Sequence, residues 1–283
     1  MTKKYVLITG CSEGGLATSM IKAYLRRNYT VLATLRDTSK AGALHKTENV
    51  RVLQLDIISS ESIHNCVEEV NGITGGTLDV LVNNAAVAQV MPLLDFSIEE
   101  AKRHFDTNVW GLLAMVQAFA PMLIKAQGVV CNISSVLGEM VYAWQGIYGS
   151  SKAAVTLISE TLRLEMAPLG VRVVVVALGG VSTFQNDPKN RPDLVLPARS
   201  YYEPIHAAIN RHQKNLIFAK KQDASVATEN IVSDVLGGRN AIIRRGEGST
   251  MAWLGNTFMT HEQFINVLNK ESGLDGLKAP GKL

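Results

Sequence analysis

The sequence predicts an α/β fold in which a doubly wound parallel sheet carries helices on both faces. Short apolar runs rich in β-branched residues alternate with longer amphipathic segments as far as residue 183. The first run ends in a glycine-rich turn, as expected where a strand leads into a helix. With 283 residues, of which 47% are hydrophobic, the chain is long enough to bury the core of one large domain.

The expected strands are apolar on both faces, which suits a parallel sheet that is covered by helices. They are residues 5–9, 30–35, 50–55, 78–82, 128–134, 171–178 and 241–243. The expected helices are residues 16–25, 62–70, 98–124, 147–166 and 225–236. Ser225 is a candidate N-cap of the last helix, which Gly237 and Gly238 would end. Strands that alternate with helices in this way imply right-handed crossovers.

Residues 184–224 interrupt the alternation, because half of the eight prolines fall within them. We expect an irregular insertion with some helix in a single domain, between a core (residues 1–183) and a C-terminal part (residues 225–283). Four apolar side chains of the insertion either form a lid over a bound substrate or pack on the sheet: Tyr201, Tyr202, Ile205 and Ile209.

Composition and charge exclude several classes of protein. The 28 basic and 25 acidic residues are scattered and leave a net charge of +3, too little for a nucleic-acid surface. Three cysteines form no disulfide framework, so a reducing, cytoplasmic location is expected. The longest apolar run, residues 109–124, is shorter than a bilayer requires and is expected to be a core helix. No signal peptide is evident, while peripheral association with a membrane or lipid stays open. The six histidines show no metal-ligand spacing with the cysteines, so no metal is expected.

The turn after the first strand, residues 9–17, is typical of a loop that binds a pyrophosphate. Glycines let the backbone approach the phosphates, and the start of a helix offers free N–H groups. The alternative is a tight turn without a ligand. The candidate contacts in this turn are Gly10, Ser12, Glu13, Gly15 and Leu16. Cys11, beside the helix start, is either a reactive thiol or a small loop filler.

The turn after the second strand should meet the adenosine ribose. Arg36 follows Leu35 there and supplies a cation suited to a 2′-phosphate, which favours NADP(H) over NAD(H). Asp37 and Glu13 oppose this preference, and the alternative for Arg36 is an ordinary exposed arginine.

Tyr148 and Lys152 are four residues apart and therefore share one face of a helix. A neighbouring ammonium, together with the positive charge of an oxidised nicotinamide, would lower the pKa of the tyrosine and make it an acid–base group. Ser135 ends a strand 13 residues earlier and can hydrogen-bond a substrate carbonyl. Asn84 ends another strand, and Asn108 lies in the long apolar helix, where a buried asparagine needs partners.

These motifs, in this order, resemble the short-chain dehydrogenase/reductase family over about residues 3–183. The resemblance implies a Rossmann fold in which Tyr148 donates a proton during reduction and Lys152 lowers the pKa of that tyrosine and holds the ribose. It further implies that Ser135 polarises the carbonyl and that Asn108 holds a water that relays protons to Lys152. The remaining cofactor contacts that it implies are Asp56 and Ile57 at the adenine, Asn84 and Ala85 beside the adenosine, Val181 at the nicotinamide and Thr183 at its carboxamide.

Within the family, residues 9–15 resemble the fungal acyl-dihydroxyacetone-phosphate reductase branch, and residues 33–37 resemble NADP-preferring hydroxysteroid dehydrogenases. Three positions depart from the family pattern. Ala17 replaces the last glycine of the loop, Glu13 replaces a small or basic residue, and Leu178 replaces a proline. These changes are expected either to weaken cofactor binding or to mark a different task.

We therefore expect an NADPH-dependent carbonyl reductase of the short-chain type that acts on a bulky, hydrophobic ketone or aldehyde, with Tyr148 as the proton donor. Two alternatives stay open. One is a non-redox cyclase, isomerase or epimerase, and the other is a nucleotide-sensing module without catalysis. The family resemblance also implies a homo-oligomer, a dimer or tetramer.

Overall fold

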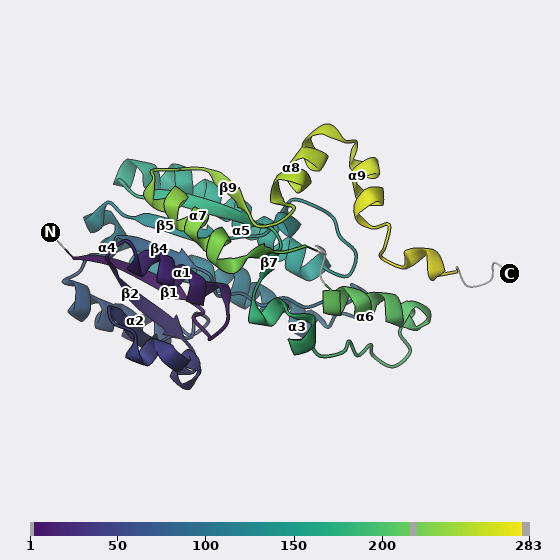
Figure 1. Ribbon diagram of the computed structural model, residues 1–283, viewed down its shortest axis with the longest axis horizontal. Coiled ribbons are helices and arrows are strands. Elements are labelled where there is room, and N and C mark those ends of the chain that lie inside the picture. Colours follow the sequence, from purple (N-terminus) through teal and green to yellow (C-terminus); the bar gives the residue numbers. More distant parts are fainter. Residues whose placement is uncertain (1–2, 216–219, 279–283) are drawn as a thin grey trace.

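A seven-stranded sheet forms the centre of the computed structural model, which describes residues 3–215 and 220–278 (Figure 1). All strand pairs are parallel, and the strand order is β3-β2-β1-β4-β5-β6-β9. The strands are β1 (Lys4–Thr9), β2 (Tyr29–Leu35), β3 (Val50–Gln54), β4 (Val80–Asn83), β5 (Val129–Ile133), β6 (Arg172–Leu178) and β9 (Ile242–Arg245). The predicted doubly wound parallel sheet is confirmed. The order reverses between β1 and β4, the point at which such folds bind ligands beyond the carboxyl ends of the strands.

Helices cover both faces of this sheet because successive strand residues point to opposite sides. Alternate residues of β1 show this: Val6 and Ile8 join a buried cluster with α1 (Leu16–Leu25) and α7 (Ala224–Leu236). Leu7, between them, joins the opposite cluster. The helices on that side are α2 (Ser60–Thr74), α4 (Gly111–Ala126) and α5 (Gly146–Met166). The predicted N-cap of α7 is wrong, because Asp223 and not Ser225 accepts the capping hydrogen bonds.

One long helix contains an irregular turn that the sequence does not predict. Residues 98–126 run through α3 (Ile98–Phe105), a π turn (Asp106–Trp110) and α4. The segment is long and apolar enough to cross a membrane. In the structure, however, α4 packs on the sheet through buried side chains such as Met115 and Phe119, as expected for a core helix.

Residues 184–224 and 249–276 lie beyond the carboxyl ends of the strands (Figure 1). The first segment contains three short 3-10 turns and α6 (His206–Asn215), and its end forms β8 (Gln222–Asp223), which pairs with β7 (Val181–Ser182). The second contains α8 (Ser249–Phe258), α9 (His261–Leu268) and a 3-10 turn (Leu274–Gly276). Another 3-10 segment, η1 (Thr38–Lys46), follows β2.

The apolar side chains of the insertion join a small buried cluster with residues that precede and follow the insertion. Ile205 and Ile209 are buried against Trp144 and Leu194, and Tyr202 packs against the same group. Tyr201 is exposed. None of these four predicted lid residues lines the two cavities at the carboxyl ends of the strands. Tyr202, Ile205 and Ile209 instead pack in a cluster beside the sheet that also contains Val90 and Trp144.

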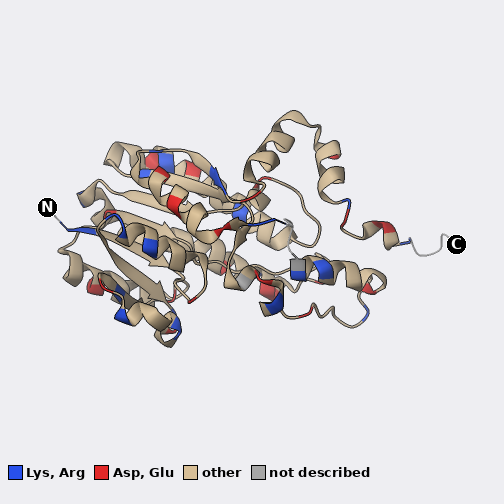
Figure 2. Ribbon diagram, in the orientation of Figure 1, with Lys and Arg blue, Asp and Glu red and all other residues tan. Residues whose placement is uncertain are grey.

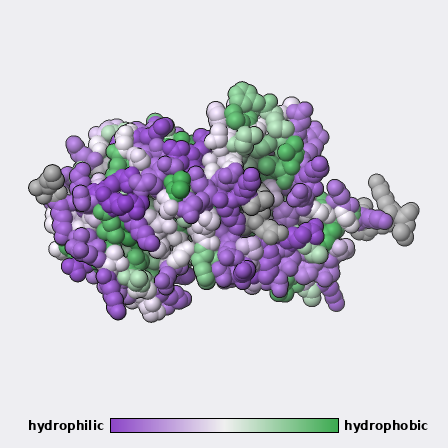
Figure 3. Space-filling model, in the orientation of Figure 1, coloured by the Kyte–Doolittle hydropathy of each residue, from purple (hydrophilic) through white to green (hydrophobic). Residues whose placement is uncertain are grey.

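The surface carries charges of both signs interspersed over helices and loops (Figure 2). Apolar side chains gather over α8 and α9 (Figure 3), where Met251, Phe258 and Val267 are exposed.

Candidate active site

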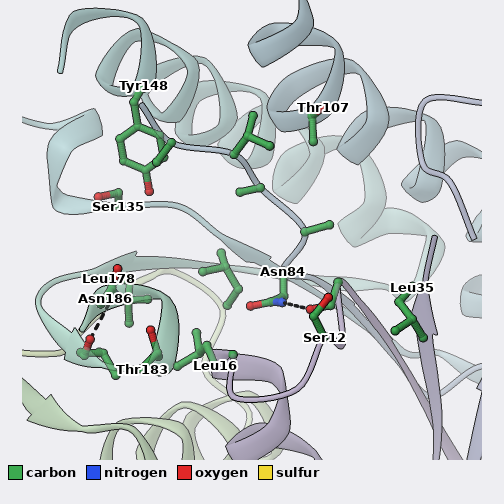
Figure 4. A pocket seen from close by; sticks show the side chains of 18 of the residues that line it. Ser12, Leu16, Leu35, Asn84, Thr107, Ser135, Tyr148, Leu178, Thr183 and Asn186 are labelled. Carbon is green, nitrogen blue, oxygen red and sulfur yellow. Dashed lines mark hydrogen bonds between the residues drawn. The ribbon is translucent and has the colours of Figure 1, made fainter. Parts of the chain in front are cut away.

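A cavity of about 720 Å³ opens at the carboxyl ends of the strands, within the size range of cofactor and ligand sites. It runs from the glycine-rich turn to the start of α5, so that Ser12 and Leu35 lie far from Tyr148 (Figure 4). Every predicted dinucleotide contact except Glu13 lines it: Gly10, Ser12, Gly15, Leu16, Arg36, Asp56, Ile57, Asn84, Ala85, Tyr148, Lys152, Val181 and Thr183.

The glycine-rich turn is fastened to the end of β4. The Thr9 hydroxyl accepts hydrogen bonds from the backbone N–H groups of Asn84 and Ala85, both at 3.0 Å. The Asn84 amide in turn donates to the Thr9 carbonyl at 2.9 Å. Gly10 follows Thr9 and has a φ of +72°, and a Cβ on Gly10 would come within 2.9 Å of the Ala85 Cα. Only glycine fits this position, because both its conformation and its close neighbour exclude a side chain.

The start of α1 leaves its N–H groups available to an anion. Gly15 is the N-cap, no side chain caps the helix, and its first turn has no acidic residue. The methyl of Ala17 is buried between α1 and the sheet and does not line the cavity, so it takes no space from a pyrophosphate. Cys11 is buried as well, and burial raises the pKa of its thiol to about 12, which favours the role of loop filler over that of reactive thiol.

Of the three charged residues weighed for cofactor choice, only Arg36 lines the cavity. The Asp37 carboxylate instead caps η1, accepting from the backbone N–H and the hydroxyl of Ser39 at 3.1 and 2.6 Å. These hydrogen bonds lower the pKa of Asp37. The Glu13 carboxylate lies against Gly42 of η1, which places it outside the cavity lining. The Glu13 side chain, predicted to contact the dinucleotide, is thus directed toward η1 and away from the cavity.

The predicted catalytic residues Ser135, Tyr148 and Lys152 meet at the other end of the cavity. Tyr148 and Lys152 lie one turn apart on α5, and Ser135 follows β5 as the N-cap of a short 3-10 turn. The Tyr148 hydroxyl is directed toward Ser135 (Figure 4). Ser135 is fixed in place because its hydroxyl also accepts from the Leu137 N–H at 3.1 Å.

The predicted lowering of the Tyr148 pKa involves the charge of an oxidised nicotinamide and stays a prediction, and without that charge the pKa of Tyr148 is raised. Burial raises this pKa, and a hydrogen bond with Ser135 and the charge of Arg191 offset part of the increase. The Lys152 ammonium lies 5.8 Å from the centre of the Tyr148 ring and donates to the Ile133 carbonyl at 2.8 Å. Because this ammonium is buried, its own pKa falls to about 8.

Asn108 lies in the π turn and does not line the cavity. Its side-chain oxygen accepts from the Val87 N–H at 2.8 Å, and its amide donates to the Val87 carbonyl and the Ser151 hydroxyl, each at 2.9 Å. These contacts satisfy the buried amide and join the helix to the segment after β4 and to α5. These contacts of its side chain position the elements around the site, and the water relay implied for Asn108 stays a prediction.

Asn83 at the end of β4 and Asn132 in β5 have a structural role. The Asn83 amide donates to the Asn132 side chain at 2.9 Å, and the Asn132 amide donates to the Ser159 hydroxyl at 2.8 Å. All three residues are buried. This chain of hydrogen bonds joins β4, β5 and α5, the elements that carry Asn84, Ser135 and Tyr148.

A smaller cavity of about 120 Å³ adjoins the first and shares Ser135, Tyr148 and Leu178 with it. Leu178 faces Tyr148 across this end of the site, together with Thr183 and Asn186 (Figure 4). The insertion adds Arg191, which sequence reasoning missed. Its position between Asn190 and Pro192 in an irregular segment gives no periodic or strand-end signal that could have found it.

The amino-acid sequence of the chain is similar to those of known proteins. A family model for short chain dehydrogenases matches residues 4–193. The chain is 54% identical over 272 residues to short-chain dehydrogenase cctT of Talaromyces islandicus, covering 96% of each protein. It is 35% identical over 209 residues to an NADPH-dependent 1-acyldihydroxyacetone phosphate reductase of Schizosaccharomyces pombe, covering 73% of this chain and 70% of that one.

Solved structures show the same fold. A short-chain dehydrogenase from Streptomyces avermitilis superimposes with a TM-score of 0.78 at 23% identity, over 97% of this chain and 98% of that one. A short chain dehydrogenase from Burkholderia cenocepacia J2315 in complex with NADP superimposes with a TM-score of 0.73 at 22% identity, over 92% and 95% of the two chains.

Proposed function

Since the chain belongs to the short-chain dehydrogenase/reductase family of oxidoreductases, we propose that it is an NADPH-dependent reductase of a ketone or aldehyde. One observation carries this proposal. Ser135, Tyr148 and Lys152 line one end of a cavity whose other end is formed by the glycine-rich turn and Arg36. A module that only senses a nucleotide has no need of the first group.

The residues present fit a dinucleotide phosphate. The uncapped start of α1 and the close approach at Gly10 suit the pyrophosphate. Arg36 would pair with the 2′-phosphate, and Val181 and Thr183 line the end near Tyr148, where the nicotinamide would lie. When bound, the reduced cofactor supplies the hydride for the carbonyl carbon.

Tyr148 would supply the proton. Because burial raises its pKa, the phenol is protonated at neutral pH and can donate to the carbonyl oxygen as that oxygen gains negative charge. The Ser135 hydroxyl would donate a hydrogen bond to the same oxygen. Lys152, buried beside them, would stabilise the phenolate that remains after the transfer.

Preference for NADPH is supported by the position of the charges. Arg36 lines the adenosine end, while the carboxylates of Asp37 and Glu13 are held by or against η1. The reductase of Schizosaccharomyces pombe is NADPH-dependent, and the Burkholderia cenocepacia structure contains NADP.

We also propose a homo-oligomer. The outer face of α5 exposes Leu157 and Leu164, which are seven residues apart and therefore on one side of the helix. Trp110, in the π turn that packs against α5, is exposed as well. A second copy of the chain would cover this apolar surface, and light scattering at micromolar protein concentration tests it.

The test of function is calorimetric titration with NADPH and, separately, with NADH, followed by a screen of carbonyl compounds for NADPH oxidation. We expect micromolar binding of NADPH and at least tenfold weaker binding of NADH. Tighter binding of NADH would contradict the cofactor proposal. Binding of neither nucleotide would contradict the reductase proposal, and so would product formation without net NADPH oxidation.

A further inference from the structure

The smaller cavity is lined by both apolar and polar side chains. The apolar side chains include Val90, Val136 and Leu137. The polar side chains include two cationic residues of the insertion, Arg191 and Lys221, together with Ser135 and Tyr148. Of the residues that the structure describes, no aspartate or glutamate lines this cavity.

Both cationic side chains are held in place by backbone carbonyls. Arg191 donates to the Gln213 carbonyl at 3.0 Å, and Lys221 donates to the Asn186 carbonyl. Their exposed surface is small enough that burial lowers the pKa of each. Each also has an acidic or titratable neighbour, because Tyr148 interacts with Arg191 and Asp187 with Lys221.

The two positive charges are close enough to repel each other, and the charge of Arg191 further lowers the pKa of Lys221. Like charges in a partly desolvated cavity destabilise one another, and a bound anion relieves that cost. The pair is therefore arranged for a negatively charged group that lies next to Tyr148.

A third polar group faces the same cavity. Gln145 lines it and is 7% exposed, and its side-chain oxygen accepts no hydrogen bond within the described part of the chain.

We propose that the substrate carries an anionic oxygen group, of the carboxylate type, that binds between Arg191 and Lys221 beside the carbonyl that Tyr148 protonates. This inference rests on the proposed reductase function, because it specifies the substrate of that site. The guanidinium of Arg191 can give a carboxylate a charge-assisted hydrogen bond, and Lys221 adds a second positive charge. The apolar body of the substrate contacts the apolar side chains of Val90, Val136 and Leu137.

The test is binding to the NADPH-saturated protein, followed by calorimetry. Two pairs of equal size are compared: acetate with acetamide, and benzoate with benzamide. None of the four is a ketone or an aldehyde, so the result does not depend on turnover, and saturation with NADPH is verified first. We expect at least one acid to bind about tenfold more tightly than its amide, as a charge-assisted hydrogen bond predicts. Saturation with NADPH but no preference for either acid would overturn this inference and leave the reductase proposal standing.

Substitutions of the basic residues identify the side chains that bind the anion. Arg191→Met should abolish the preference for the acid, Lys221→Met should reduce it, and Arg191→Lys should retain part of it. Lys189→Met is the matched control, because it removes an exposed positive charge of the insertion outside the cavity lining and should leave the preference unchanged. If Arg191→Met retains the preference but weakens NADPH binding, the guanidinium serves the cofactor and the inference is wrong.

Discussion

The two ends of the site are built by different means. At the glycine-rich end, the carboxyl ends of neighbouring parallel strands carry the lining residues, and the side chains of Thr9 and Asn84 join the turns after β1 and β4 through hydrogen bonds to backbone groups. At the insertion end, the irregular segment that contains Asp193 and Leu194 is held to α6 by hydrogen bonds of the Asn210 side chain. The lining of the first end therefore follows directly from the strands, while the lining of the second depends on contacts between segments of the insertion.

This difference separates chemistry from selectivity. Tyr148 and Lys152, which are proposed to act on any substrate, lie on α5, which packs on the sheet. Arg191, which is proposed to distinguish one substrate from another, lies on the insertion. We expect substitutions on the sheet side to alter turnover or cofactor binding, and substitutions on the insertion to alter substrate affinity.

The largest effect is expected for Tyr148→Phe, which keeps the ring and removes the proton donor. NADPH oxidation with a carbonyl substrate should fall by about a thousandfold. NADPH affinity, measured by calorimetry, should stay within about threefold, because the cofactor's remaining contacts are unchanged. If this variant keeps most of its activity, the assignment of Tyr148 is wrong.

Lys152 should set the alkaline limit of the reaction. Because its pKa is lowered to about 8, it loses its positive charge as the pH rises through 8, and kcat/KM for reduction should fall there. The raised pKa of Tyr148 keeps the proton donor intact over the same range. Lys152→Met should reduce kcat/KM about a hundredfold, and Lys152→Arg should move the fall to higher pH. If kcat/KM still falls near pH 8 in Lys152→Arg, the titration of another group causes the fall.

Arg36→Leu should weaken NADPH binding about tenfold, since it removes one charge-assisted contact with a phosphate. NADH affinity should change by less than about twofold. Glu13→Gln is the matched control, because the Glu13 carboxylate does not line the cavity and its removal should alter neither affinity appreciably. Equal losses for both nucleotides in Arg36→Leu would show that the side chain does not select the 2′-phosphate.

The smallest effect is expected for Asn210→Ala in the insertion. This change removes hydrogen bonds of 2.9 and 3.1 Å to Leu194 and Asp193, each worth about 1 kcal/mol. KM for a carbonyl substrate should rise a few-fold and the thermal midpoint should fall by a few degrees, while NADPH affinity stays nearly constant. An equal loss of NADPH affinity would contradict the idea that the insertion affects substrate binding and not cofactor binding.

The sequence predicts the sheet and the lining of its glycine-rich end well, because both follow from periodicity and from residues placed directly after strands. It predicts less well where a side chain's direction depends on its neighbours. Asp37 and Glu13 are adjacent in sequence to residues that line the cavity. Both side chains are held outside the cavity by η1, a segment that the sequence periodicity does not predict.

The electrostatics of the site are also hard to predict from sequence. The spacing of Tyr148 and Lys152 correctly places both in one cavity, but only the structure shows that Lys152 is buried and bonded to the Ile133 carbonyl. Burial depends on long-range packing, which local spacing does not contain. For the same reason, Arg191 and the unpaired Gln145 oxygen are visible only in three dimensions.

The π turn of Asp106–Trp110 has a consequence for how the chain can vary in length. Successive side chains of an α-helix are rotated by about 100° around the helix axis. The additional residue of a π turn therefore rotates the side chains of α3 by about that angle relative to those of α4. Losing one residue here would leave a regular helix but turn either Asn108 away from Val87 or Phe119 away from the sheet. Substitutions along this helix can be compensated by neighbouring side chains, whereas a deletion of one residue cannot.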